Sequence, residues 1–243
     1  MKILLVNPNT TSSMTDKVGE TAKTVAASGT EIIAVNPEYG PVSIEGYYDE
    51  VFSIPGLLEE VRKGEASGCD GTVIACFDDT GLDAARCIAS GPVVGICEAA
   101  MQIASLLANS FSVVTTLRRS IPALEELKVK YGMSMKCNRI RAIDVPVLEL
   151  ENPDSEASKI IRGEIQEALD EDRSEAIVLG CAGMADLTSE LSKEFGVPVI
   201  DGVSAAVKIV ESLVAIGLQT SKVNGYAFPR SKQYFGLFKT FQP

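Results

Sequence analysis

The chain contains no histidine and no tryptophan among its 243 residues. The absence of histidine excludes the serine hydrolase triad, zinc sites with histidine ligands and ordinary imidazole acid–base catalysis. Any proton transfer or metal ligation must therefore come from cysteine, carboxylate, lysine or tyrosine side chains.

Positive charge is also scarce. The chain has 22 Lys and Arg against 33 Asp and Glu, which gives a net charge of −11. This balance repels a phosphate backbone or an anionic lipid surface, so we expect neither nucleic acid nor a membrane as a partner. The content of 46% hydrophobic and 23% charged residues is typical of a soluble globular protein and excludes disordered and fibrous classes.

Long apolar runs are missing. The run at residues 3–6 is too short for the apolar region of a secretion signal. The longest uncharged stretch, residues 99–117, is interrupted by polar side chains and is predicted to form a helix and then a strand. None of the six cysteines forms a CxxC pair. We therefore expect a cytoplasmic protein with free thiols and no metal site.

What the sequence does contain is an alternation of short Val- and Ile-rich runs with segments of helical period. Strands are predicted at residues 2–6, 31–35, 72–75, 93–96, 112–115, 139–143, 176–179 and 197–200. Helices are predicted at residues 15–26, 55–65, 82–89, 120–131, 154–169, 187–195 and 203–216. The alternation predicts an α/β fold with mainly parallel sheets. A further strand is expected at residues 222–228, returning to the first part of the chain.

A weak internal repeat organises these elements. Residues 71–76 and 91–100 align with residues 175–181 and 196–206, and the first segment of each pair ends at a cysteine. We infer two similar α/β sandwich halves related by pseudo-twofold symmetry, with the active site in the cleft between them. The halves are assigned to residues 1–97 with about 202–243, and to residues 98–201.

Cys76 and Cys181 occupy the matched positions of this repeat, where a strand ends and a helix is about to begin. Open α/β folds bind ligands at that edge of the sheet. Most free cysteines act as small buried hydrophobes, and this is our interpretation of the cysteines at 69, 87, 97 and 137. Two cysteines at matched positions favour a chemical role instead, because a twofold relation would make them face each other across the cleft.

Two facing thiols suit a racemisation, in which a base removes a proton from one face of a carbon and an acid returns one to the other face. A helix N-terminus is expected to lower the pKa of such a thiol. Asp78 and Asp79 would raise that pKa if they pointed at Cys76, but we interpret them as caps of the helix that begins near Gly81.

The carbanion formed in such a reaction needs hydrogen-bond donors for its oxygen. Backbone N–H groups or short polar side chains at strand ends can supply them, although each could equally serve an ordinary turn or capping role. These candidates are Asn9, Thr10, Thr115, Thr116, Ala182 and Gly183. Phe77 and Met184 are expected to form apolar walls. Arg118 and Arg119 are expected to be solvated surface residues.

Eight short segments carry a resemblance to a known family. They are VNPNT at 6–10, SIEG at 43–46, VIACFDD at 73–79, GPVVGI at 91–96, SVVTT at 112–116, RAIDVP at 141–146, VLGCAGM at 178–184 and VPVIDG at 197–202. Together they resemble the hydantoin racemases of the aspartate/glutamate racemase superfamily. The similarity runs over nearly the whole chain, to about Pro229.

The resemblance implies a racemase of 5-monosubstituted hydantoins that uses Cys76 and Cys181 as its acid/base pair. It also implies that no metal or other cofactor takes part and that the protein is a homo-oligomer. Allantoin is itself a 5-substituted hydantoin, so the resemblance also admits an allantoin racemase.

Several activities of the same superfamily stay open as well. An aspartate/glutamate-type amino-acid racemase is less similar, because those enzymes flank their cysteines with Asn-Thr and Thr-Glu, whereas Phe77 and Ala182 here suit a neutral ring. A maleate isomerase or an arylmalonate decarboxylase is also open, although a decarboxylase needs only one proton donor. The alternative that is not an enzyme is a binding module whose two lobes close on a small molecule.

Overall fold

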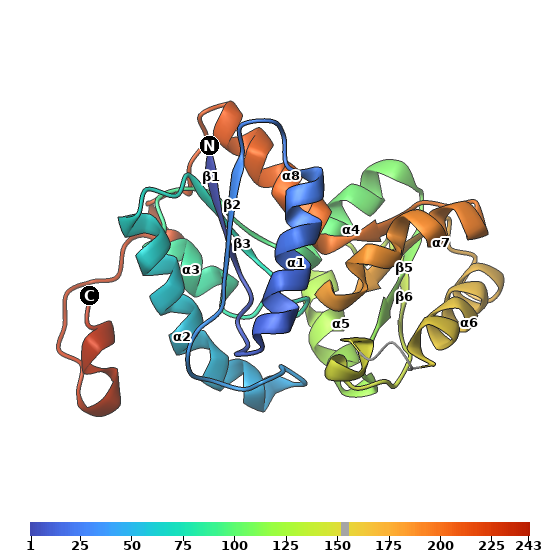
Figure 1. Ribbon diagram of the computed structural model, residues 1–243, viewed down its shortest axis with the longest axis horizontal. Helices are drawn as coiled ribbons and strands as arrows, with labels where there is room; N and C mark the ends of the chain where they lie inside the picture. The colour runs from blue at the N-terminus through green and yellow to red at the C-terminus, as the bar shows by residue number, and fades with distance from the viewer. Residues whose placement is uncertain (152–155) are drawn as a thin grey trace.

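A computed structural model describes residues 1–151 and 156–243 (Figure 1). Its strands are β1 (Lys2–Val6), β2 (Glu31–Val35), β3 (Gly71–Ile74), β4 (Val93–Gly95), β5 (Phe111–Thr115), β6 (Cys137–Ala142), β7 (Ala176–Gly180) and β8 (Val199–Asp201). Its α-helices are α1 (Ser12–Val25), α2 (Tyr47–Ala66), α3 (Leu82–Ile88), α4 (Ile96–Leu107), α5 (Ile121–Lys130), α6 (Ala157–Asp170), α7 (Thr188–Phe195) and α8 (Gly202–Ala215). The first two residues of the helix predicted at 154–169 lie outside the described ranges. Within those ranges, every helix is too short or too polar to cross a bilayer.

The strands form two four-stranded parallel sheets. The first has the order β2-β1-β3-β4 and the second the order β6-β5-β7-β8. The two orders are the same when each strand of the first sheet is matched with the strand four places later in the chain. This arrangement confirms the predicted α/β fold with two similar halves.

Two helices cross from one sheet to the other. Helix α4 follows β4 of the first sheet but packs against β7 and β8 of the second, and α8 follows β8 but packs against β3 and β4. Both helices lie between the sheets together with α1 (Figure 1). The helices meet at their N-termini, because a Cβ atom on Gly202 would lie 2.4 Å from the carbonyl oxygen of Ile96. This reciprocal exchange is the packing expected of a pseudo-twofold relation.

The largest part of the hydrophobic core lies around α4 and α8, the two helices that cross between the sheets. Small side chains of α4 and α8, among them Ala100 and Ala206, are fully buried and allow the helices to approach closely. They join one apolar cluster with Ile3 of the first sheet and Val113 of the second. The carboxyl ends of the central strands are thereby held against each other. The division of the chain into residues 1–97 with about 202–243, and residues 98–201, stays a prediction.

The expected strand at residues 222–228 is wrong. This segment contains a short 3-10 helix, η4 (Asn224–Tyr226), and pairs with neither sheet. Asn224 has a φ of 61°, a left-handed conformation that breaks an extended chain. The remaining C-terminal residues form an arm that projects from the body of the molecule and carries the 3-10 helix η5 (Gly236–Phe241) (Figure 1).

Candidate functional site

Cys76 and Cys181 line one cavity between the carboxyl ends of the two sheets. Cys76 follows β3 and Cys181 follows β7, the strand that matches β3 in the second sheet. The cavity has a volume of about 40 Å³, enough to admit water. Its lining comprises Asn7, Asn9, Met14, Ile44, Ala75, Cys76, Phe77, Asp78, Thr115, Thr116, Ser120, Val147, Gly180, Cys181 and Ala182.

Most of the residues predicted from the sequence lie in this lining. Of the ten, Thr10, Gly183 and Met184 lie outside it. The backbone N–H of Gly183 donates to the Cys181 thiol. Sequence reasoning missed Asn7, Met14, Ile44, Ser120 and Val147 as wall residues. Asn7 and Ser120 could have been suspected, because each adjoins a polar segment at a strand end. Ile44 belongs to the SIEG segment at 43–46, but no local pattern marks Ile44 or Val147 as wall residues.

Those two loops meet beside the cavity. The backbone N–H of Val147 donates to Glu45 Oε1 at 3.2 Å, which joins a loop that follows β2 to one that follows β6. Ile44 and Val147 are both buried. The wall of the cavity is therefore closed by segments about 100 residues apart in the chain.

The thiols are difficult to ionise. Burial, reinforced by the negative charge of Asp78, raises the pKa of Cys76 well above its ordinary value. Burial also raises the pKa of Cys181, to about 11. The expected lowering of the thiol pKa is thus wrong, because the desolvation of a buried thiolate outweighs the nearby hydrogen-bond donors.

The two thiols differ in their surroundings. The Thr80 hydroxyl lies 3.4 Å from the Cys76 sulfur and donates to it, but the Asp78 carboxylate opposes ionisation there. At Cys181, the N–H of Gly183 and the positive charge of Lys17 favour the thiolate, although the charge of Asp78 opposes it there as well. Lys17 Nζ also donates to the Gly183 carbonyl oxygen at 2.7 Å, so helix α1 positions the turn after Cys181. Cys181 is therefore the more acidic thiol.

A hydrogen-bond network places Asn9 in the wall. Asn7 Nδ2 donates to Asn9 Oδ1 at 2.9 Å and to Thr15 Oγ1 at 3.0 Å. Asn9 Oδ1 also accepts from the backbone N–H of Thr11 at 2.9 Å, so that oxygen is satisfied within the protein. Asn9 Nδ2 lies 3.6 Å from the sulfur of Met14, a weak acceptor. The Asn9 amide is thus held with its donor side available to a ligand.

The two predicted threonines differ in their hydrogen bonding. Thr115 Oγ1 donates to the Gly180 carbonyl oxygen at 3.0 Å, which links β5 to the end of β7. Within the described ranges, the Thr116 hydroxyl makes no hydrogen bond, although the residue is 4% exposed and lines the cavity. Thr116 is therefore better placed than Thr115 to donate to a ligand.

Asp79 caps a different helix from the one expected. Its carboxylate accepts from the backbone N–H of Cys97 at 3.0 Å and of Glu98 at 2.9 Å, at the start of α4. Helix α3, which begins after Gly81, has no side-chain cap from the residues that the structure describes. A Cβ atom on Gly95 would lie 2.2 Å from Asp79 Oδ1, so only glycine there admits the carboxylate. The prediction failed because α4 approaches Asp79 only in the folded chain.

The cations and the other cysteines lie outside the cavity. The Arg118 side chain is 78% exposed and pairs with Asp144, and Arg119 is exposed too, as predicted. All six cysteines are free, and the four assigned a structural role are absent from the lining. Within the ranges that the structure covers, no three His, Cys, Asp or Glu side chains are grouped to hold a metal ion.

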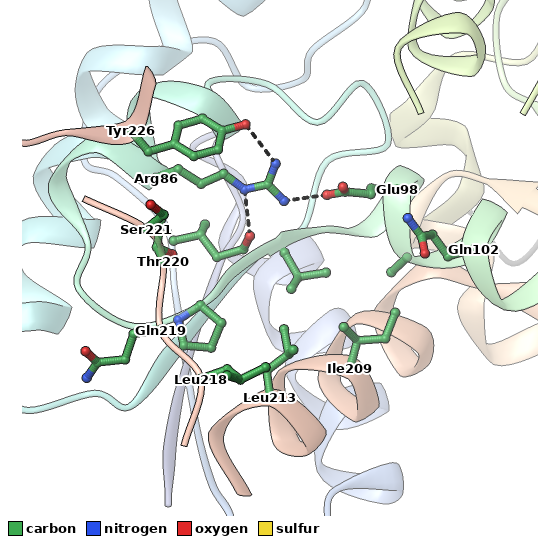
Figure 2. Close-up of a pocket in the computed structure, with 14 residues that line it drawn as sticks. Arg86, Glu98, Gln102, Ile209, Leu213, Leu218, Gln219, Thr220, Ser221 and Tyr226 are labelled. Atoms are coloured by element: carbon green, nitrogen blue, oxygen red, sulfur yellow. Dashed lines mark hydrogen bonds and ion pairs between the residues drawn. The ribbon is translucent and has the colours of Figure 1, made fainter. Parts of the chain in front are cut away.

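A larger cavity, of about 420 Å³, lies between α4, α8 and residues 218–226. Figure 2 shows Arg86 at one side of it, between Tyr226 and Glu98. Arg86 donates to Tyr226 Oη at 3.4 Å, to Glu98 at 2.5 Å and to the Val93 carbonyl oxygen at 3.0 Å. Among the described residues, no thiol lines this cavity, and its arginine is fully paired, so the smaller cavity is the candidate site.

Comparisons with known proteins show which family the chain resembles. The chain matches the Asp/Glu/Hydantoin racemase family over residues 3–210. A hydantoin racemase of Rhizobium meliloti is 53% identical over 236 residues, which cover 97% of this chain and 98% of the relative.

Two solved structures of allantoin racemases are similar as well. The one from Klebsiella pneumoniae superimposes with a TM-score of 0.97 at 51% identity and covers 100% of this chain and 99% of its own. The one from Pseudomonas fluorescens superimposes with a TM-score of 0.93 at 40% identity and covers 97% of this chain and 100% of its own. The chain therefore belongs to the Asp/Glu/Hydantoin racemase family and is a racemase, an enzyme of the isomerase class.

Proposed function

We propose that the enzyme interconverts the D and L forms of 5-monosubstituted hydantoins, with Cys76 and Cys181 acting on opposite faces of C5. The observation that supports this proposal is that the two thiols come from matching strand ends of the two sheets and line one cavity. A racemase needs one proton-transfer group on each side of the reacting carbon. The similarity to a protein named hydantoin racemase supports the substrate class.

The surroundings of the thiols suggest how the cycle starts. Cys181 forms the thiolate more easily, so it removes the C5 proton in one direction while the neutral Cys76 thiol gives its proton to the opposite face. Afterwards Cys181 is a thiol and Cys76 a thiolate, the state that binds and inverts the other enantiomer. The proton count balances, and no further acid or base is required.

The negative charge that develops on the substrate carbonyl oxygen needs donors. In this proposal, the Asn9 amide and the Thr116 hydroxyl supply them, because neither has a strong acceptor within the described protein. Phe77 and Ala182 contribute apolar wall beside the thiols. Gly183 contributes through its hydrogen bond to Cys181 and Thr115 through its link to β7.

The charge of the lining favours a neutral substrate. In the part of the chain that the structure describes, no lysine or arginine lines the cavity, whereas a free amino acid would need a cation for its carboxylate. An allantoin racemase is the second candidate, supported by the two similar allantoin racemase structures. We further propose that the reaction needs no metal or organic cofactor, and that the enzyme is a cytoplasmic homo-oligomer.

The direct test follows optical rotation while the protein is incubated with single enantiomers of 5-benzylhydantoin, allantoin, aspartate or glutamate. The proposal expects decay of rotation with the hydantoins and little or none with the amino acids. Comparable kcat/KM values for glutamate and 5-benzylhydantoin would refute it and favour an amino-acid racemase. Binding of a hydantoin without any turnover would instead favour a binding module.

A further inference from the structure

Asp78 is an unusual member of the cavity lining. Apart from the two thiols, it is the only ionisable side chain among the described lining residues. Within the described chain, no hydrogen bond or ion pair reaches its carboxylate. Its neighbour Asp79, in contrast, accepts from two backbone N–H groups and from Tyr131.

The other charges near Asp78 are negative. Burial and the carboxylates of Glu50 and Asp79 raise the pKa of Asp78 to about 7. Glu50 lies in the first turn of α2, and within the described ranges its buried Oε1 atom has no hydrogen-bond partner. Asp78 is only partly buried, so its carboxylate reaches the cavity, and a partly desolvated carboxylate without a donor destabilises the fold. Such a group persists where a ligand supplies the missing donors.

A hydantoin has the required donors, since its ring carries N–H groups and some 5-substituents carry more. A carboxylate accepts such hydrogen bonds strongly and repels a second carboxylate. We propose that Asp78 determines substrate specificity, favouring neutral 5-substituents that carry N–H donors and rejecting those that carry a carboxylate. This inference rests on the proposed hydantoin substrate and adds which hydantoins the site accepts.

The test compares three hydantoins that share the ring and differ only at C5. Allantoin carries a ureido group with N–H donors, 5-benzylhydantoin carries neither donors nor charge, and hydantoin-5-acetic acid carries a carboxylate. The kcat/KM of each is measured at about pH 8, where the Asp78 carboxylate is ionised. Each value is divided by that for 5-benzylhydantoin, which cancels any effect of a substitution on the thiols themselves.

Asp78→Asn keeps the shape of the side chain and removes its charge. We expect the ratio for hydantoin-5-acetic acid to rise at least about 10-fold, because like-charge repulsion is lost. The ratio for allantoin should fall about 5-fold, because hydrogen bonds to a neutral amide oxygen are weaker than those to a carboxylate. Asp78→Ser serves as a second variant if the first folds poorly, and it should change both ratios in the same directions.

The control is Asp170→Asn, which removes the same charge from an exposed position at the end of α6 and should leave both ratios unchanged. If either ratio in a folded Asp78 variant matched the wild type, Asp78 would not determine specificity. A wild-type enzyme that racemises none of the three hydantoins would instead refute the proposed function. The two failures are therefore distinguishable.

Discussion

Tyr131 Oη donates a hydrogen bond to Asp79 Oδ2 across a distance of 2.6 Å. Asp79 belongs to the turn after Cys76, whereas Tyr131 follows α5, a helix between two strands of the second sheet. The same carboxylate caps α4. The turn that carries one thiol is therefore anchored to elements of the other half of the molecule.

The first prediction concerns this hydrogen bond. Tyr131→Phe should lower the free energy of unfolding by about 1–2 kcal/mol, because a buried carboxylate loses one of its donors. Urea unfolding near pH 8 measures the effect. Tyr39→Phe is the matched control, since Tyr39 donates to Glu59 at 2.8 Å on the exposed surface and should lose less than about 0.5 kcal/mol. Equal losses in the two variants would contradict the anchoring role of Tyr131.

The second prediction tests the acid/base pair. Cys76→Ala and Cys181→Ala should each reduce racemisation by about 10²- to 10⁴-fold, the usual contribution of one general acid or base. Circular dichroism should stay unchanged. Each variant retains one thiol and should still exchange solvent deuterium into C5 of one enantiomer without inverting it. Cys69→Ala, outside the cavity, should keep wild-type activity, and a Cys76 or Cys181 variant that also did so would refute the two-base mechanism.

The third prediction concerns cofactors. Dialysis against a strong chelator should leave the racemase activity intact, because the proposed proton transfers use only the two thiols. Omission of a reducing agent should lower the activity slowly through thiol oxidation, and thiol reduction should restore it. Activity that disappeared on chelation and returned with a divalent cation would refute the proposal.

The fourth prediction concerns pH. Both thiols have a raised pKa, so at neutral pH each is mainly protonated, and the thiolate needed as the base becomes more abundant as pH rises. We expect kcat/KM to increase between about pH 7.5 and about pH 9. The increase should approach about 10-fold for each pH unit. The negative charge of Asp78 raises the pKa of both thiols, so Asp78→Asn should move this increase to lower pH. Asp170→Asn should reproduce the wild-type profile, and a wild-type rate that fell with pH over this range would be incompatible with a thiolate base.

The sequence by itself determined the two sheets and the pair of thiols. Runs such as residues 3–6 and 176–179 are apolar on both faces, as expected of a strand buried between helices, so their positions are visible locally. The matched cysteines were visible because the repeat places a cysteine just after the end of each of two matching strands. Seven of the ten predicted site residues line the cavity for the same reason, since each lies near the carboxyl end of a strand.

The tertiary structure alone decided which distant groups meet. The capping of α4 by Asp79, the contact of Glu45 with Val147 and the buried position of Ile44 depend on how the two halves pack. Local periodicity carries no information about such contacts, because loops and turns reach their partners through space. The raised pKa values of the thiols could not be predicted from the sequence for the same reason. A helix N-terminus can be predicted from the chain, but the desolvation that outweighs it exists only once both sheets enclose the cavity.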